Sequence, residues 1–373
     1  MRWRGCRQGV WMGGGTMRRM ACNDRAMLDL AARLGVRGAG HVEPNPMVGC
    51  VICRAGEGEA GGRIIGMGHH RRFGGLHAEV DALGRCKALG QDPRGGTMYV
   101  TLEPCNVPGR NGACVDAVLG AGIAEVVCAR RDPSPGKGGG SARLERAGVR
   151  VRFTGASSAA WRLAEPWVKR LETGLPWVIA KWAQSIDGCL TTGPGQGRWI
   201  TSARSRHAVH QLRSRVDAII TGGGTVRADN PMLTARGVPI RRRAVPVVLT
   251  GGELPAGSHL AENKGTVVVR ASRAGGAEGL RGVLGMLARE HGVHTAMIEG
   301  GPGLLSSVLE WGLADELHVY TGGVVVGGGG GLEVGRLVGV QGWEVVSCRV
   351  RGGDVRVVYR RGEKKWTNGQ MVK

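Results

Sequence analysis

The hydrophobic positions in the first half of the chain alternate between helical spacing and strand-like runs. Apolar residues at helical intervals predict a helix over residues 25–34. The apolar run after the Pro44-Asn45-Pro46 turn predicts a buried strand over residues 47–53. Further elements are expected in this half: helices over 78–89 and 115–119, and strands over 97–102, 124–129 and 149–153. Strands that alternate with helices indicate an α/β layer domain.

A second half repeats this alternation after a polar, helical stretch. Its expected strands cover 177–182, 218–221, 245–250, 266–270, 295–299 and 316–322, and its expected helices cover 280–291 and 304–311. Residues 344–359 alternate like an antiparallel hairpin that turns at Gly352-Gly353. A length of 373 residues fits two domains. We therefore expect a disordered extension over 1–20, domains over 21–155 and 176–362, a linker over 156–175, and a basic tail over 363–373.

Charge narrows the classes of function. The chain has 51 Lys and Arg against 30 Asp and Glu, and this net charge of +21 is compatible with nucleic-acid binding. We favour a surface of dispersed arginines, some serving a phosphate-bearing small molecule, because no basic stretch is interleaved with aromatic side chains that stack on bases. The short basic runs 241–243 and 364–365 are interpreted as a solvated loop and a solvated tail.

Neither a membrane protein nor a secreted protein is expected. No apolar segment approaches the roughly 20 residues that span a bilayer. The first 20 residues are basic but lack the continuous apolar core of a secretory signal. Ten cysteines occur at irregular positions. A cytoplasmic protein whose thiols are free or bound to metal fits this pattern best.

The strongest chemical signal is a set of metal-ligating residue types. His77-Ala-Glu79 is followed by Cys105, which comes after a proline, and then by Cys114. One imidazole and two thiolates suit Zn²⁺ and leave a fourth tetrahedral position for water. Glu79 is placed to move a proton without ligating the metal. The alternative is that the three ligands are ordinary buried residues, but their order with the glutamate is typical of zinc-dependent nucleobase deaminases.

A second cysteine pair has the spacing of a metal site but a different interpretation. Cys50 and Cys53 lie within the strand expected over residues 47–53. Side chains three positions apart in a strand point to opposite faces, so we interpret these thiols as core residues.

The longer loop between the two zinc cysteines makes the resemblance more specific. Eight residues separate Cys105 from Cys114. This loop, the P-N-P-x-V-G turn and the downstream Asp132-Pro-Ser-Pro resemble the deaminase half of the RibD family, the bifunctional deaminase/reductases of riboflavin biosynthesis. The resemblance extends over residues 24–362. It implies that pyrimidine or ribose-phosphate contacts come from Asn45, His70, Glu79 and Arg110.

Four motifs carry the chemistry of the second half. They are K-W-A-Q-S-I-D-G at 181–188, R-W-I-T-S at 198–202, T-V-R-A-D-N-P-M-L-T at 225–234 and E-G-G-P-G-L at 299–304. The Gly-rich turn permits close backbone approach, and the following helix offers N–H groups to a phosphate. The sequence of this turn is not G-x-G-x-x-G, which argues against a Rossmann dinucleotide site. Together and in this order, the motifs resemble the RibD reductase domain, which has a dihydrofolate-reductase-like fold.

This second resemblance implies a cofactor site and a substrate site. The implied NADPH-binding residues are Ala183, Trp199, Thr225, Asp229, Gly301, Pro302, Gly303, Leu304 and Leu305. The implied substrate-binding residues are Gly197, Arg213, Leu233, Arg236 and Glu299. An arginine in such a set suits a phosphate, because a guanidinium binds it in bidentate fashion.

The two resemblances together predict a fold and a reaction sequence. The expected fold class is α/β, with a cytidine-deaminase-like three-layer domain followed by a dihydrofolate-reductase-like domain. The expected enzyme uses Zn²⁺ to deaminate 2,5-diamino-6-(5-phosphoribosylamino)pyrimidin-4(3H)-one and NADPH to reduce the ribosyl side chain, and it forms a homo-oligomer, a dimer or tetramer. Val107 and Ser134 depart from the family pattern, which leaves open a single-activity homologue with a weakened deaminase half. A tRNA or nucleobase deaminase is the other alternative.

Overall fold

The computed structural model describes most of the chain and divides it between two sheets. The described residues are 23–54, 62–108, 112–136, 138–192, 199–270, 275–328, 330–332, 337, 340–362, 366–367 and 370–371. The expected extension over 1–20 lies outside this part of the chain, as does most of the expected tail over 363–373. In the described part of that tail, β14 (Trp366–Thr367) pairs with β15 (Gln370–Met371).

The first half forms a five-stranded mixed sheet with the order β2-β1-β3-β4-β5. Its strands are β1 (Gly49–Arg54), β2 (Arg63–His69), β3 (Thr97–Val100), β4 (Glu125–Cys128) and β5 (Arg150–Phe153). Strand β1 pairs antiparallel with β2 and with β3, and β3, β4 and β5 are parallel. The helices are α1 (Asp24–Gly35), the short 3-10 helix η1 (Val36–Gly38), α2 (Ala78–Ala88), α3 (Cys114–Gly120) and α4 (Gly140–Arg146). Strand β2 and helix α4 were not expected from the sequence.

Helices cover both faces of this sheet, so the first half has three layers. On one face, α1 buries Met27, Leu28 and Ala31 against the sheet, and on the other α2, α3 and α4 pack around Cys50 and Ile52. Cys50 and Cys53 belong to cores on opposite faces, which confirms their interpretation as core thiols.

Two glycines of this sheet allow helices on opposite faces to approach closely. A Cβ at Gly49 would lie 1.9 Å from the Ala31 carbonyl oxygen of α1, and one at Gly68 would lie 2.3 Å from the Ala82 amide nitrogen of α2. No side chain fits at either position, and α2 begins beside the zinc ligand candidates.

The second half forms an eight-stranded sheet with the order β12-β13-β11-β6-β10-β7-β8-β9. Its strands are β6 (Trp177–Gln184), β7 (Ala218–Gly222), β8 (Val245–Thr250), β9 (Val267–Arg270), β10 (Thr295–Ile298), β11 (Glu316–Thr321), β12 (Trp343–Arg351) and β13 (Asp354–Arg361). The hairpin β12–β13 turns at Gly352-Gly353 as expected, and it pairs antiparallel with β11, whereas the remaining strands are parallel.

Helices also cover both faces of the second sheet. They are α7 (Ala203–Arg213), α8 (Gly223–Asp229), α9 (His259–Glu262), α10 (Gly276–Glu290) and α11 (Pro302–Glu310). Helices α10 and α11 bury their apolar residues in one core, and α8 and α9 bury Val226 and Leu260 in another. The predicted α/β organisation of both halves is therefore confirmed. Helices α7, α8 and α9 were not expected.

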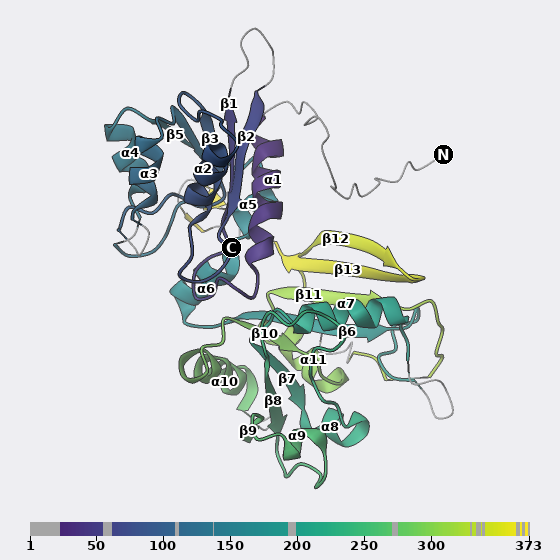
Figure 1. Cartoon of the computed structure of the whole chain (residues 1–373). Helices are drawn as coiled ribbons and strands as arrows, with labels where there is room; N and C mark the ends of the chain where they lie inside the picture. Colours follow the sequence, from purple (N-terminus) through teal and green to yellow (C-terminus); the bar gives the residue numbers. More distant parts are fainter. Residues whose placement is uncertain are drawn as a thin grey trace, which may run out of the picture.

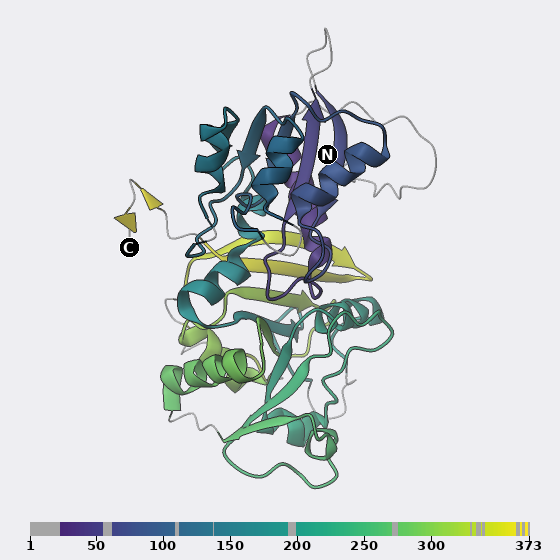
Figure 2. The same cartoon turned by 60° about the vertical axis from the view of Figure 1, so that its left-hand side comes forward.

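The segment between the halves packs against its neighbours. It contains α5 (Ser158–Arg162) and α6 (Glu165–Thr173). Ala160 joins the core of α1, while the Lys169 ammonium of α6 is ion-paired with Asp315 of the second half. Figures 1 and 2 show the hairpin β12–β13 between the five-stranded sheet and the rest of the eight-stranded sheet.

The basic run 241–243 is not simply a solvated loop. The run 241–243 was interpreted as a solvated loop, but Arg242 pairs with Asp217 and reaches the backbone carbonyl of Glu43 in the first half. Tertiary contact, which a local pattern does not reveal, decides this position. Across the described ranges, each helix is either too short or too polar to cross a bilayer.

Candidate functional site

The three predicted zinc ligands converge on one point. The ligand atoms of His77, Cys105 and Cys114 all lie within 4.8 Å of one another. The His77 Nδ1 atom is 3.2 Å from the Cys114 sulfur and 3.5 Å from the Cys105 sulfur. A tetrahedral zinc ion places a nitrogen and a sulfur ligand about 3.5 Å apart. The donor set and its spacing therefore fit Zn²⁺.

Local structure holds these ligands at the ends of two helices. His77 is the N-cap residue of α2, and Cys114 is the first residue of α3. Cys105 follows the end of β3, and its sulfur accepts a hydrogen bond of 3.4 Å from the Cys114 backbone N–H. The positive end of a helix dipole favours thiolate over thiol.

The electrostatics of the site favour a thiolate at Cys105. The hydrogen bond from the Cys114 thiol lowers the pKa of Cys105 to about 4, with further contributions from His77 and from the Cys114 backbone N–H. The same hydrogen bond raises the pKa of Cys114, because in the metal-free pair one proton is shared between two sulfurs. A bound cation replaces that proton, since a coordinating thiol is deprotonated.

Glu79 lies beside these ligands in the first turn of α2. It is only 3% exposed. Burial raises the pKa of Glu79 to about 7, and the neighbouring Cys105 acts in the same direction. A carboxyl group with a pKa near neutral can both accept and donate a proton at physiological pH. This is the property required of a proton shuttle.

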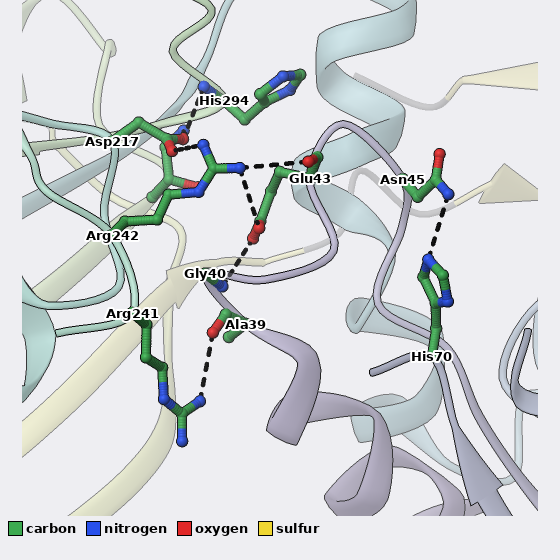
Figure 3. A network of polar contacts seen from close by, with 10 residues as sticks. Ala39, Gly40, Glu43, Asn45, His70, Asp217, Arg241, Arg242 and His294 are labelled. Carbon is green, nitrogen blue, oxygen red and sulfur yellow. Dashed lines mark hydrogen bonds and ion pairs between the residues drawn. The ribbon is translucent and has the colours of Figure 1, made fainter. Parts of the chain in front are cut away.

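The candidate ligands open onto a cavity of about 380 Å³. His70 lies in its wall, where its Nδ1–H donates to the Leu76 carbonyl at 2.8 Å and its Nε2 accepts from the Asn45 side chain at 3.2 Å. Burial and the adjacent His77 lower the pKa of His70, so the ring is neutral. The two predicted substrate residues Asn45 and His70 are therefore brought together in one wall (Figure 3).

Several wall residues were not found from the sequence. They are Phe73, Glu103, Asp132 and Trp167, and the last of these comes from α6, in the segment expected as a linker. Glu103 accepts hydrogen bonds from the backbone N–H groups of Asp132 and Ser141, and so holds the 132–134 loop at the cavity. The Asp132-Pro-Ser-Pro motif was the one available signal. Val107 and Ser134, which depart from the family pattern, also line the cavity.

Positive charge is scarce in this wall. Among the described residues that line the cavity there is no lysine or arginine. The predicted substrate residue Arg110 lies outside the described part of the chain, as does Gly197 of the second half.

A buried ion cluster marks the second half. The Arg213 guanidinium donates two hydrogen bonds of 2.8 Å to the Glu299 carboxylate, and the Lys181 ammonium lies 3.4 Å from it. Burial opposes ionisation of Glu299, but Lys181 and Arg213 outweigh it and lower its pKa to about 2. Lys181 and Glu299, which belong to separate motifs, are thus brought together with Arg213, which lies outside the four motifs. The Arg213 guanidinium therefore binds a carboxylate of the protein in bidentate fashion, whereas the sequence suggested that it binds a phosphate.

The Gly-rich turn leads from β10 into α11. Gly301 caps α11, Pro302 opens it, and the Gly301 N–H donates to the Thr225 side chain at 3.0 Å. An adjoining cavity of about 440 Å³ is lined by Gly303 and Leu304. Arg270, at the end of β9, also lines this cavity and was missed from the sequence, although it ends an expected strand.

The other predicted residues of the second half are less close together. Ala183 lies on β6 beside Tyr320, and Trp199 is 60% exposed under the Arg206 guanidinium. Leu233 is a core residue with a φ of 51°. Asp229 ends α8, and Leu305 is a residue of α11 that is buried in the core. Arg236 is exposed, and its backbone N–H donates a hydrogen bond to His210.

Comparison with known proteins identifies both halves. Residues 22–130 match the family described as the cytidine and deoxycytidylate deaminase zinc-binding region, and residues 176–357 match the RibD C-terminal domain. The chain is 34% identical to the riboflavin biosynthesis protein RibD of Aquifex aeolicus over 333 residues, which cover 84% of this chain and 90% of the relative. It is 34% identical to RibD of Escherichia coli over 327 residues, which cover 80% and 87%.

Solved structures agree with these matches over the length of the chain. The deaminase/reductase of Thermotoga maritima superposes with a TM-score of 0.73 at 28% identity, covering 91% of this chain and 98% of its own. RibD of Acinetobacter baumannii also has a TM-score of 0.73 at 28% identity, covering 91% and 99%. The chain therefore belongs to the RibD family, and it is a bifunctional enzyme of riboflavin biosynthesis with a zinc-dependent deaminase half and an NADPH-dependent reductase half.

Proposed function

We propose that the first half deaminates 2,5-diamino-6-(5-phosphoribosylamino)pyrimidin-4(3H)-one in the cavity beside Glu79. The observation that carries this proposal is the convergence of His77, Cys105 and Cys114 next to a buried carboxyl group. The Thermotoga maritima relative is described as a diaminohydroxyphosphoribosylaminopyrimidine deaminase, which names the same substrate class.

In this proposal His77, Cys105 and Cys114 would hold the zinc ion, which would supply activated water when bound. Glu79 would accept a proton at its carboxylate and deliver it to the departing amine; its pKa of about 7 suits both transfers. Asn45 and His70 orient the pyrimidine by hydrogen bonds from the cavity wall. Arg110 is proposed to contact the ribose phosphate.

We propose that the second half reduces the ribosyl side chain of the deaminated product. NADPH, which supplies the hydride, is assigned to the Gly301–Leu305 turn with Thr225, Ala183, Trp199 and Asp229. The substrate is assigned to Gly197, Arg213, Leu233, Arg236 and Glu299. The Lys181–Glu299–Arg213 cluster supports this assignment, because it holds fixed charges near the end of β10 where the turn begins.

Glu79→Gln separates the proposed chemistry from folding. The variant should bind zinc like the wild type and lose ammonia release by about 10²-fold or more, because the amide cannot shuttle a proton. It should still oxidise NADPH when the deaminated intermediate is supplied. Ammonia release is measured with the diaminopyrimidine phosphate, and zinc by metal analysis. Full ammonia release by the variant would exclude Glu79 as the proton carrier.

We also propose the bounds of the domains, the cellular compartment and the oligomeric state. We propose domains over 21–155 and 176–362, which the family matches over 22–130 and 176–357 support. We propose that the enzyme is cytoplasmic, because its zinc ligands are thiolates that need a reducing compartment. We also propose a homo-oligomer, a dimer or tetramer, which size-exclusion chromatography with light scattering would measure.

A further inference from the structure

A second cavity, of about 260 Å³, lies between the two halves and adjoins the deaminase cavity. Its walls come from the turn that carries Glu43 and Asn45, from α6, and from strands β6, β11 and β13 of the eight-stranded sheet. Asn45, Pro46 and Trp167 line both cavities. The two cavities therefore share a wall made of these three residues.

The turn in this shared wall is tied to both halves (Figure 3). On one side, the Asn45 amide donates to His70 in the deaminase cavity. On the other, the Glu43 carbonyl oxygen accepts a 3.2 Å hydrogen bond from Arg242, which is itself ion-paired with Asp217 of the reductase half. Asp217 also accepts hydrogen bonds of 2.9 Å from the backbone N–H groups of His294 and Thr295. One short turn thus joins a substrate-cavity residue to the interdomain cavity.

The acidic groups in the wall of the interdomain cavity are neutralised by groups around them. Glu316 is ion-paired with Arg360 at 2.7 Å and accepts a hydrogen bond from the buried, neutral His318. Glu43 accepts a 3.0 Å hydrogen bond from the Gly40 backbone N–H and lies 3.7 Å from Arg242. Neither carboxylate is left to balance a further cation.

Two arginines in the same wall lack a carboxylate partner. Within the described ranges, the Arg215 guanidinium makes no hydrogen bond or ion pair. The residue is exposed at its surface, but partial desolvation together with Arg241 and Arg356 lowers its pKa. Arg356 donates to the neutral His318 Nδ1 at 3.0 Å, and its Nε is buried without a partner. Two guanidinium groups that repel each other in a half-buried cavity form a site for an anion.

The chemistry of the two reactions identifies the anion class. The deaminase cavity has no described lysine or arginine in its wall, yet its proposed substrate carries a phosphate. The wall of the interdomain cavity neighbours the ion cluster of the reductase half, because His318 in this wall is the β11 partner of Lys181 in the β6–β11 register, and Lys181 is paired with Glu299. Pockets for whole small ligands have volumes of about 300–1,000 Å³, so this cavity suits the ribose-phosphate end of such a molecule.

We propose that Arg215 and Arg356 bind the phosphate of the deaminated pyrimidine in the interdomain cavity, so that the intermediate passes from the deaminase to the reductase half without release into solvent. The anion site rests on the two arginines of the cavity wall, whereas its assignment to the phosphate of the intermediate and its use in transfer rest on the proposed function. No bond is made or broken at this site, and its ligand enters and leaves as the same phosphate ester.

Binding of inorganic phosphate and of ribose 5-phosphate tests the site directly. The probes are titrated calorimetrically into the zinc-loaded full chain. Arg215→Ala should weaken phosphate binding about tenfold or more, because charged hydrogen bonds are lost, and Arg215→Lys should weaken it less. Arg281→Ala, on the exposed face of α10, is the matched control and should bind like the wild type. Equal affinity of Arg215→Ala and Arg281→Ala would overturn the site, provided that thermal unfolding shows both variants folded.

Isotope dilution tests the transfer. Labelled diaminopyrimidine phosphate and NADPH are given to the enzyme with an excess of unlabelled deaminated intermediate. The wild type should carry most of the label into the reduced product at early times, and Arg215→Ala should release labelled intermediate into the unlabelled pool. Complete dilution in the wild type would overturn the transfer. Absence of both reactions in the zinc-loaded wild type would contradict the proposed function. The phosphate titration would still test the anion site at Arg215 and Arg356 in that case.

Discussion

The buried ion cluster of the reductase half offers a quantitative test through Arg213→Met. Methionine keeps an unbranched chain of similar reach and removes the guanidinium that donates two hydrogen bonds to Glu299. The Glu299 side chain is 10% exposed, so little solvent is available to replace those bonds. Lys181, 3.4 Å away, would be the remaining cation of the cluster.

The magnitude follows from the lowered pKa of Glu299. The difference between its ordinary value of 4.5 and about 2, at about 1.4 kcal/mol for each pKa unit, corresponds to about 3 kcal/mol of stability. Two cations share this effect, and the variant also loses two charged hydrogen bonds to a buried carboxylate. We therefore expect Arg213→Met to lower the free energy of unfolding by about 2–4 kcal/mol at pH 7.

The pH dependence has a defined sign. Because the folded pKa of Glu299 lies below the unfolded value, its ionised form contributes stability above pH 4.5, and this contribution is lost as the pH falls through about 2. The difference between wild type and variant should be full at pH 7 and shrink below pH 4.5. Urea unfolding followed by tryptophan fluorescence measures it, with zinc removed from both proteins so that acid does not alter metal content.

Arg281→Met is the matched control for this measurement. Arg281 makes an exposed pair with Glu278 at 3.4 Å, and such pairs contribute about 0–1 kcal/mol. The stabilising role of the Arg213–Glu299 pair is refuted if Arg213→Met lowers the free energy of unfolding no more than Arg281→Met does. It is also refuted if Arg213→Met lowers this free energy equally at pH 7 and at pH 3.

Two other changes test the metal site and the contact between the halves. Cys114→Ser should lower zinc affinity at least tenfold, because a thiolate ligand is replaced by a hydroxyl. Metal analysis after dialysis measures the bound zinc. The control variant Cys348→Ser, at an exposed position, should retain as much zinc as the wild type. Arg242→Met removes the contacts to Asp217 and Glu43 and should cost about 2–3 kcal/mol. It should also separate the unfolding of the two halves in urea, and a single unchanged transition would contradict that expectation.

Those elements and chemical groups that depend on a local pattern could be predicted from the amino-acid sequence. Helix α1 and strand β8 follow from spacing alone, and the hairpin turn at Gly352-Gly353 follows from two adjacent glycines between alternating strands. The zinc ligands and Glu79 were found because the metal demands particular donor types in a recognisable order. Strand β2 and the short helix α4 escaped, because glycines break the pattern of the first and the second offers few apolar positions.

The residues that share a site although they lie far apart in the sequence were revealed by the folded structure. Trp167 was assigned to a linker, yet it lines the deaminase cavity, because α6 folds back over the first half. Arg242 was assigned to solvent, yet it joins the halves. Arg213 was assigned to the substrate from the sequence, and only the structure shows that it is also paired with Glu299. The physical reason is the same in each case: a charge or a ring is described by its neighbours in space, and those neighbours are separated from it by many residues along the chain.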